Sequence, residues 1–583
     1  MAKTLSVLFI LFEIYFLTQL MFLKKNNNKL NFVKWLIINI MLIMSYHAIV
    51  AGILSVFNIR VGIFKIGLFV LVADVILTIY NSKHERQKYC IEIYDIVAPI
   101  VIIIVVMICA INQFGTGLDN LNFETSDPAN HLKCAMDVAI YGKLNAMYFN
   151  PLNNGLFIEL CIPFLGKLIS VYRLYIFWEM FMLFFSGISV YLISRDWMKN
   201  ISSKAISLIF IFFYMCSYPL NSMVFGFGYL SMGISIVAMI ILLTNEYINK
   251  TINEKINIIF LSMIMFSILV TYTLFAPFIY LASAISILIF EIRQKNNIKL
   301  LLKKIIFLFV LPGLFGSFLM VKEMFSASSV ADLIKGEGYI YTDLFINSII
   351  FLPFAIATVG RIIKRKENNI LLSVVIVDVV AIIAMLFLGL NGKVSAYYYS
   401  KMYYMLSLVL ILGTIYYLTS LTQQHCELSW GLIITGILFT FIYYGDVENE
   451  IMEQSVYFNN KKVSYVFYSL YDFNYEKAKT DGYSKYKLQL YDWINENVSN
   501  DKKVPCVSSV ENCFWYAALT KQRMEKYTYY YAKMNNIDYL SNLKDADYVI
   551  VDITSEPYCL YKEYFDSLEK VFQNYHGFVA VNK

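Results

Sequence analysis

Long apolar runs, each able to cross a bilayer as a helix, recur from the start of the chain to about residue 445. Short polar intervals separate them. A run of about 20 apolar residues is typical of a transmembrane helix, and the pattern predicts about fourteen of these. They fall near residues 4–23, 35–57, 61–80, 96–113, 172–194, 205–219, 228–244, 256–271, 274–292, 305–321, 344–360, 369–389, 402–421 and 429–445. The sequence therefore predicts an α-helical polytopic membrane protein.

The pattern changes after residue 445. Residues 446–583 carry charge throughout and contain no spanning run. The segment SKYKLQLYDWINENVSND predicts an amphipathic helix with an apolar stripe at Leu488, Leu490, Trp493 and Ile494. KVPCVSSV and DYVIVDI predict buried strands, and YKEYFDSLEKVFQN predicts a helix before a last strand, GFVAVNK. Alternating strands and helices indicate a small C-terminal α/β domain.

Lysine and arginine are concentrated in one set of alternate intervals. This set includes the clusters at residues 24–34, 83–88, 195–204, 250–255, 293–304 and 361–366. Intervals rich in Lys and Arg face the cytoplasm, so the other set and the tail should be extracytoplasmic. We divide the chain into N-terminal helices and cytoplasmic loops (1–95), a transmembrane region with the outer loop 114–171 (96–445), and an extracytoplasmic α/β domain (446–583). The expected location is the cell membrane, as a multi-pass protein.

Composition agrees with the membrane class. Hydrophobic residues make up 59% of 583 and charged residues 15%, with a mean hydropathy of +0.59. In soluble domains, by comparison, hydrophobic residues average about 45–50% and charged residues about 25%. The net charge of +6 lies in short clusters between apolar runs, which predicts membrane topology and no nucleic-acid partner. None of the nine cysteines has zinc-site spacing; Cys506 and Cys513 could form a disulfide outside the cell, leaving Cys559 over.

The outer interval from Gly115 to Glu159 is the longest polar stretch inside the membrane region. It contains Asp119, Glu124, Asp127, His131 and Asp137. Pro128 favours the first position of a helix, so a helix should begin beside Asp127. Asp127 and His131 are four residues apart and would share a helix face. Two roles for Asp127 remain open: a helix N-cap, or a base or ligand of a divalent cation.

Five charged residues fall inside predicted spans: Glu13, Lys65, Asp74, Glu179 and Asp378. Ionisable groups at membrane depth are costly and are candidates for function. They are not clustered in one pair of predicted spans, as an ion path would require. We expect Asp74 and Asp378 to form interhelical hydrogen bonds; a role in transport is the alternative.

Several segments, taken in order and with their shared sidedness, resemble the GT-C superfamily of polytopic glycosyltransferases, which use lipid-phosphate-linked sugars. They are SDPANHLKCAMD, YFNPLNNG, FGFGYLSMG, YTLFAPF, SAYYYSKMYYML and the α/β tail. The resemblance covers most of residues 96–583. The chain departs from the family pattern in three respects. About three extra helices precede the acidic loop, that loop has no adjacent acidic pair, and no Arg stands in the later outer loops.

The resemblance implies a catalytic acid in the first outer loop. In the superfamily an Asp there serves as base or metal ligand, and Asp127 matches that role, with Asp119 as the second candidate. His131 joins them as a candidate catalytic residue. A divalent metal, Mg²⁺ or Mn²⁺, would be held by Asp127.

The resemblance also implies basic residues in later outer loops that hold the lipid phosphate. Lys401 matches this role, and Lys393 is the second candidate. An equally open role for Lys401 is to anchor its helix end by snorkelling. Tyr148, in the Tyr-x-x-Pro segment, and Tyr397 are the expected sugar-binding residues; tyrosines here also fit an interfacial aromatic belt.

The expected function is transfer of a sugar from a polyprenyl-phosphate donor to a glycan, lipid or protein acceptor of a cell envelope, bacterial in type, on the outer face of the membrane. Two alternatives remain: a polytopic transporter or lipid flippase, and a non-catalytic envelope-assembly protein. A polymerase or ligase that uses lipid-diphosphate donors would need paired Arg residues in a large outer loop, which the sequence lacks.

Overall fold

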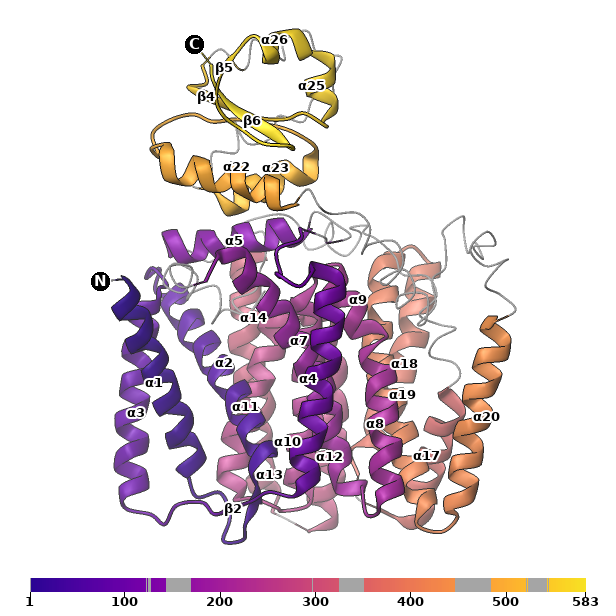
Figure 1. Ribbon diagram of the computed structural model, residues 1–583. Helices are drawn as coiled ribbons and strands as arrows, with labels where there is room; N and C mark the ends of the chain where they lie inside the picture. Colours follow the sequence, from indigo (N-terminus) through magenta and orange to yellow (C-terminus); the bar gives the residue numbers. More distant parts are fainter. Residues whose placement is uncertain are drawn as a thin grey trace.

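A bundle of long, roughly parallel helices carries a separate α/β domain on one end (Figure 1). The computed structural model describes residues 2–121, 123, 127–142, 169–295, 297–324, 351–367, 369–445, 484–520, 522, 540, 543 and 545–582. Helix α5 (Asp127–Tyr141) lies across the bundle between the helix ends and the α/β domain. We call this end of the bundle the α5 end, and the opposite end, near strand β2 (Tyr89–Cys90), the β2 end.

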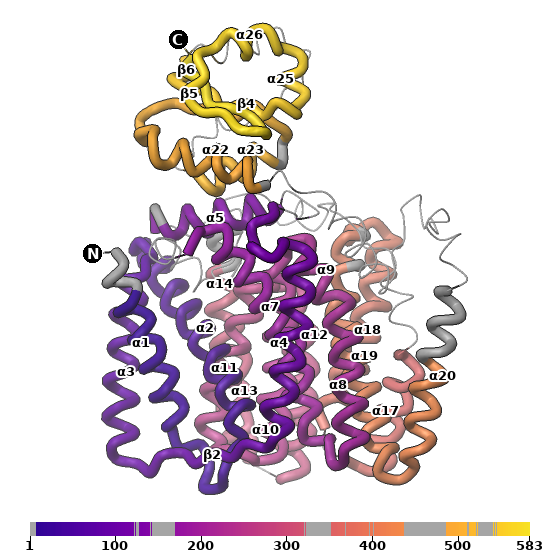
Figure 2. The backbone as a smooth tube through the Cα atoms, in the orientation of Figure 1, coloured from indigo at the N-terminus to yellow at the C-terminus, as the bar shows by residue number. Residues whose placement is uncertain are grey.

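The chain passes up and down the bundle, as the tube in Figure 2 shows. The bundle helices are α1 (Ala2–Phe22), α2 (Phe32–Val56), α3 (Ile63–Ser82), α4 (Ile93–Phe114), α7 (Val171–Ser194), α8 (Ile201–Met215), α9 (Tyr218–Val224), α10 (Gly228–Ile248), α11 (Glu254–Thr271), α12 (Ala276–Arg293), α13 (Ile298–Ile305), α14 (Leu311–Met324), α17 (Leu352–Arg365), α18 (Leu371–Leu390), α19 (Ala396–Thr422) and α20 (Cys426–Gly445). A two-residue strand β1 (Leu30–Asn31) pairs in parallel with β2.

Within the described ranges, ten helices are long and apolar enough to cross a membrane. This confirms the multi-pass helical class, but it does not confirm the predicted number of about fourteen. The four further predicted spans correspond to α1, to α13 and α14 joined by a π-helical turn (Ile306–Val310), to α17 and to α20. The central helices α7, α10 and α19 are almost wholly buried, because neighbours surround each of them.

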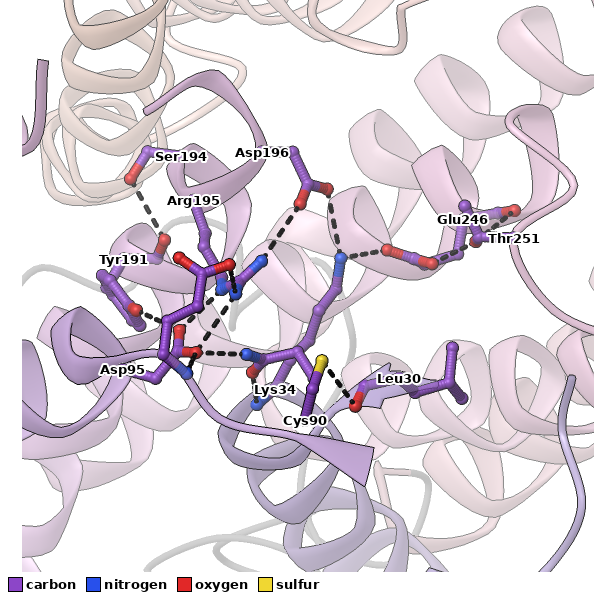
Figure 3. A network of polar contacts seen from close by, with 12 residues as sticks. Leu30, Lys34, Cys90, Asp95, Tyr191, Ser194, Arg195, Asp196, Glu246 and Thr251 are labelled. Atoms are coloured by element: carbon purple, nitrogen blue, oxygen red, sulfur yellow. Dashed lines mark hydrogen bonds and ion pairs between the residues drawn. The ribbon is translucent and has the colours of Figure 1, made fainter. Parts of the chain in front are cut away.

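A network of ion pairs joins four segments of the bundle at the β2 end (Figure 3). The carboxylate of Asp95, at the start of α4, accepts hydrogen bonds from Arg195 Nε (2.6 Å), Tyr191 Oη (2.7 Å) and Asn31 Nδ2 (2.6 Å). Lys34 of α2 pairs with Glu246 of α10 and, at 3.2 Å, with Asp196. Because each charge is matched by a nearby partner, the network holds α2, α4, α7 and α10 in register.

We expect Asp95→Asn to lower the free energy of unfolding by about 1.5–3 kcal/mol, the range for losing a hydrogen bond to a charged group. Asp95 is only 1% exposed, so water does not reach this position to replace the carboxylate as the hydrogen-bond partner of Arg195. Thermal unfolding in detergent measures the effect. The matched control is Glu92→Gln, since Glu92 also pairs with Arg195 but its side chain is 60% exposed. That control should cost less than about 1 kcal/mol, and equal losses would contradict the assignment.

The C-terminal domain contains a four-stranded sheet in the order β3-β4-β6-β5. Its elements are α22 (Ser484–Asn497), β3 (Cys506–Val507), α23 (Val510–Leu519), β4 (Tyr548–Asp552), α25 (Glu556–Leu560), α26 (Lys562–Asp566), β5 (Glu569–Gln573) and β6 (Gly577–Val581). β3 and β4 are parallel, whereas β6 is antiparallel to β4 and β5. The predicted helix at α22 is confirmed, with Leu490 and Ile494 buried, and so are the strands at β3, β4 and β6.

One prediction for this domain was wrong. The segment YKEYFDSLEKVFQN ends its helix α26 at Asp566, and Glu569–Gln573 forms strand β5. A turn at Asn574, whose side-chain oxygen accepts the amide of His576 (2.9 Å), folds β5 back onto β6 as a hairpin. Nearly all of β5 is exposed because it lies at the sheet edge, and its sequence therefore lacks the alternation of a half-buried strand.

Cys506 and Cys513 are both free thiols rather than a disulfide.

The α/β domain contacts the bundle through α23, which packs on α5. Trp515 of α23 stacks on Phe123 (ring centroids 5.7 Å apart) and meets Tyr172, at the start of α7, edge-on (5.6 Å). Trp515 is buried in this contact. Helix α5 is therefore enclosed between the bundle and the domain.

Candidate functional site

Helix α5 begins at Asp127, as Pro128 predicted. Asp127 is exposed at the helix start, whereas His131, one turn later, is buried. The ring of Pro128 lies against Gly226, so closely that a Cβ at Gly226 would be 2.1 Å from Pro128 Cγ. The close approach of these two backbones places the start of α5 directly over the loop between α9 and α10.

His131 is held in one tautomer by the loop beneath it. Its Nδ1 lies 3.2 Å from the carbonyl oxygen of Gly226. A carbonyl oxygen only accepts, so Nδ1 carries the proton and Nε2 has the lone pair. Burial lowers the pKa of His131 to about 4; the charge of Asp127 and the Gly226 bond oppose this, and Lys401 adds to it. His131 is therefore neutral near pH 7 and supplies no cation for a phosphate.

The pKa of His131 predicts a loss of stability in acid. The folded pKa lies below the ordinary value of about 6.5, so the unfolded chain binds more protons between these values. The free energy of unfolding should thus fall as pH falls from about 6.5 toward 4, by at most about 1.4 kcal/mol per pH unit. Melting curves in detergent test this. His131→Gln keeps a donor for Gly226 and should show a smaller decrease; an equal decrease in both proteins would assign the effect to other groups.

The loop between α9 and α10 is fixed from two sides. Gly226 has a φ of +69°, a conformation that favours glycine. The buried carboxylate of Glu179 on α7 accepts a hydrogen bond from the Gly228 amide at 3.2 Å, and the Tyr175 hydroxyl donates to the Gly226 carbonyl at 3.5 Å. Together with the hydrogen bond of His131, these bonds fix Gly226 and Gly228, the two residues on either side of Phe227, and so fix the position of Phe227. Sequence reasoning identified Glu179 only as a charge within a span and missed this positioning role.

Lys401 lies inside an aromatic enclosure rather than at the surface. It is 1% exposed, and its Nζ lies 4.2 Å from the ring centre of Phe227, 5.1 Å from that of Tyr397 and 5.6 Å from that of Tyr404. It also interacts electrostatically with Asp127. Ring faces attract an ammonium group, most strongly when water is excluded. A snorkelling lysine keeps its ammonium in water, whereas that of Lys401 is buried, so the side chain does not snorkel.

A row of tyrosines continues the enclosure. Tyr229 at the start of α10 hydrogen-bonds Tyr397 and meets His131 edge-on, with ring centroids 5.0 Å apart. Tyr272, between α11 and α12, lies 5.9 Å from Tyr229 and against Gly233. The segments FGFGYLSMG, YTLFAPF and SAYYYSKMYYML, far apart in sequence, thus meet beneath the start of α5. We call Asp127, His131, Phe227, Tyr229, Tyr397, Lys401 and Tyr404 the α5 site.

The structure brings together four of the predicted site residues: Asp127, His131, Tyr397 and Lys401. Two others lie apart from them. Asp119, in the turn after α4, pairs with Arg173 at 3.6 Å, and Lys393 is exposed in the turn between α18 and α19. The prediction for Tyr148 lies outside the described residues.

The described residues around Asp127 do not form a set of protein ligands that could hold a metal ion. Among the described residues, no group of three or more His, Cys, Asp or Glu side chains is placed to hold an ion. Asp127 offers one carboxylate, and the described groups that interact with it electrostatically include the side chains of His131, Lys401, Tyr229 and Tyr397. Mg²⁺ prefers several oxygen ligands, often including substrate phosphates. A divalent ion at Asp127 stays a prediction.

Aromatic residues that sequence reasoning did not assign individually, namely Phe227, Tyr229 and Tyr404, complete the α5 site. The sequence signal was their presence in the same segments that carry the predicted Lys and Tyr, but an aromatic residue near a helix end is typical of interfacial belts as well.

Comparison of the chain with protein-family models and with curated proteins finds no match.

Proposed function

We propose that the protein is a membrane glycosyltransferase that moves a sugar from a polyprenyl-phosphate donor to a cell-envelope acceptor at the α5 site, on the outer face of the membrane. One observation carries the proposal: an exposed carboxylate, Asp127, lies beside a buried ammonium, Lys401, at the end of a membrane bundle. General base catalysis and charge stabilisation of a phosphate leaving group need these two groups within one substrate length.

In this proposal Asp127 accepts the proton of the acceptor hydroxyl. The acceptor oxygen forms a bond to the anomeric carbon, and the bond from that carbon to the phosphate oxygen breaks. The lipid phosphate leaves with the electron pair. Lys401 lies where its charge can balance the departing phosphate, and the low dielectric of its aromatic enclosure strengthens that interaction.

Tyr229 and Tyr397 provide flat faces and hydroxyl groups, a combination that suits a sugar ring. The hydrogen bond between them fixes both rings. In the absence of donor, Asp127 supplies the counter-charge of Lys401. Donor phosphate would replace it, and Asp127 would then be available to the acceptor.

Mass spectrometry of envelope glycans and lipids, from cells with and without the gene, tests the function. We expect loss of one sugar residue from an envelope component, with the unused lipid-linked donor retained. Accumulation of an intact lipid-linked sugar confined to the cytoplasmic leaflet would favour a flippase. An unchanged glycan and lipid profile would contradict both.

The proposal requires the α5 end to be extracytoplasmic, and two native cysteines test this. Cys559 in α25 and Cys90 in β2 are both exposed and lie at opposite ends of the molecule (Figure 1). A membrane-impermeant maleimide should label Cys559 but not Cys90 in intact cells, and both after lysis. The opposite pattern would place the α5 site in the cytoplasm and exclude a donor presented at the outer leaflet.

A further inference from the structure

A second group of ionisable side chains lies in the unit formed by α1, α2 and α3, outside the α5 site. Glu13 of α1, His47 of α2 and Asp74 of α3 are 8%, 1% and 2% exposed. Glu13 Oε1 lies 3.0 Å from His47 Nε2. Asp74 interacts electrostatically with Glu13 and with Tyr46. Each residue is near the middle of its helix, so the group lies at membrane depth.

The carboxyl group of Asp74 has no hydrogen-bond donor for either oxygen among the residues that the structure describes, and neither does Glu13 Oε2. The expected interhelical hydrogen bond of Asp74 is thus not observed there. The sequence also suggested that the buried acids are scattered. Instead α1 and α3 lie side by side, and this packing brings Glu13 to Asp74.

A charged carboxylate without a hydrogen-bond donor is costly at membrane depth, and repulsion between two interacting carboxylates adds to that cost. The titratable side chains at the contacts of these three helices include Glu13, Tyr46, His47 and Asp74, together with Tyr15 of α1, whose hydroxyl hydrogen-bonds Thr78 of α3 at 3.0 Å. The Tyr46 hydroxyl already donates to the Phe69 carbonyl at 2.9 Å. Two carboxylates and one imidazole are neutral overall only when they hold two protons in addition to the N–H of the neutral imidazole, so the group binds protons.

We propose that Glu13, His47 and Asp74 form an exchangeable proton-binding site within the membrane region, distinct from the α5 site. Taking up a proton forms one O–H bond on a carboxylate and needs no other reactant. The acceptors are the two carboxyl oxygens of Asp74, to which no residue in the described part of the chain donates a hydrogen bond. With the second proton on His47, releasing the proton from Asp74 leaves both carboxylates charged across the contact between α1 and α3, so this proton also holds the two helices together.

Labelling with dicyclohexylcarbodiimide tests the site, because this apolar reagent modifies buried carboxyl groups in their protonated form. The full-length protein in membranes is labelled at a series of pH values from about 6 to 9, and modified peptides are mapped by mass spectrometry. We expect modification of Asp74 that falls by about tenfold per pH unit above the titration midpoint. His47→Gln removes the basic partner of Glu13 and should shift this midpoint.

Asp378 of α18 is the internal control. It is also fully buried, with no hydrogen-bond donor to its carboxyl oxygens in the described part of the chain. Its labelling should not change in the His47→Gln variant. Asp74→Asn should abolish labelling at position 74 while the protein keeps its membrane level and melting temperature.

Three results would overturn the proposal: no modification of Asp74 at any pH, modification independent of pH, or a midpoint unaffected by His47→Gln. A decrease caused by NaCl but not by choline chloride at constant pH would also overturn it, since it would identify Na⁺ rather than a proton as the bound ion.

Discussion

Asp127→Asn is expected to reduce sugar transfer by about 10²–10⁴-fold, the range for loss of a general base. The amide cannot take the acceptor proton, and it also removes the charge that interacts with Lys401. Transfer from a lipid-phosphate-linked sugar to an acceptor, followed with the purified full-length protein in vesicles, measures the effect. The loss should appear in kcat, because the base acts in the transition state.

A helix-capping role for Asp127 makes the opposite prediction, because Asn caps a helix about as well as Asp. The matched control is Asp137→Asn, the same substitution within α5 but near its other end. That variant should keep nearly full activity, and both should keep the melting temperature of the original protein. Full activity in Asp127→Asn would make Asp127 a structural residue and leave the α5 site without its base.

Lys401→Gln is expected to lower turnover by about 10²–10³-fold, the effect of removing one preorganised group that stabilises developing charge. Gln keeps much of the aliphatic stem among Phe227, Tyr397 and Tyr404 but removes the ammonium. Donor binding should weaken as well, because the phosphate is charged before and after transfer. Steady-state kinetics with varied donor separate the two effects.

Lys393→Gln is the control for Lys401→Gln. Lys393 is exposed near the same end of the bundle, only eight positions earlier, and should contribute little to either parameter. Normal kinetics in Lys401→Gln would show that the buried ammonium has no role in transfer. Impaired kinetics in Lys393→Gln alone would move phosphate binding to the exposed turn.

Local patterns were sufficient to predict the membrane-helical class, the start of α5 and most of the tail. Apolar length identifies a helix that can cross a bilayer without reference to its neighbours. The start of α5 follows from Pro128, and the stripe of Leu490 and Ile494 follows from helical periodicity. These features depend on residues within a few positions of one another. Strand β5 was mistaken for a helix because its pairing with β6, rather than its own pattern, determines it.

Only the tertiary structure decided which polar groups meet. An apolar helix has no periodic signal for the neighbour it will face, since its lipid-facing and protein-facing sides are both hydrophobic. The sequence therefore left Lys401 between a surface anchor and a buried cation, and it suggested that Glu13 and Asp74 were unrelated. Packing of α19 against the start of α10 buries Lys401 over Phe227, and packing of α1 against α3 brings the two acids together. The energy of a buried charge depends on its partners, and those partners come from distant parts of the chain.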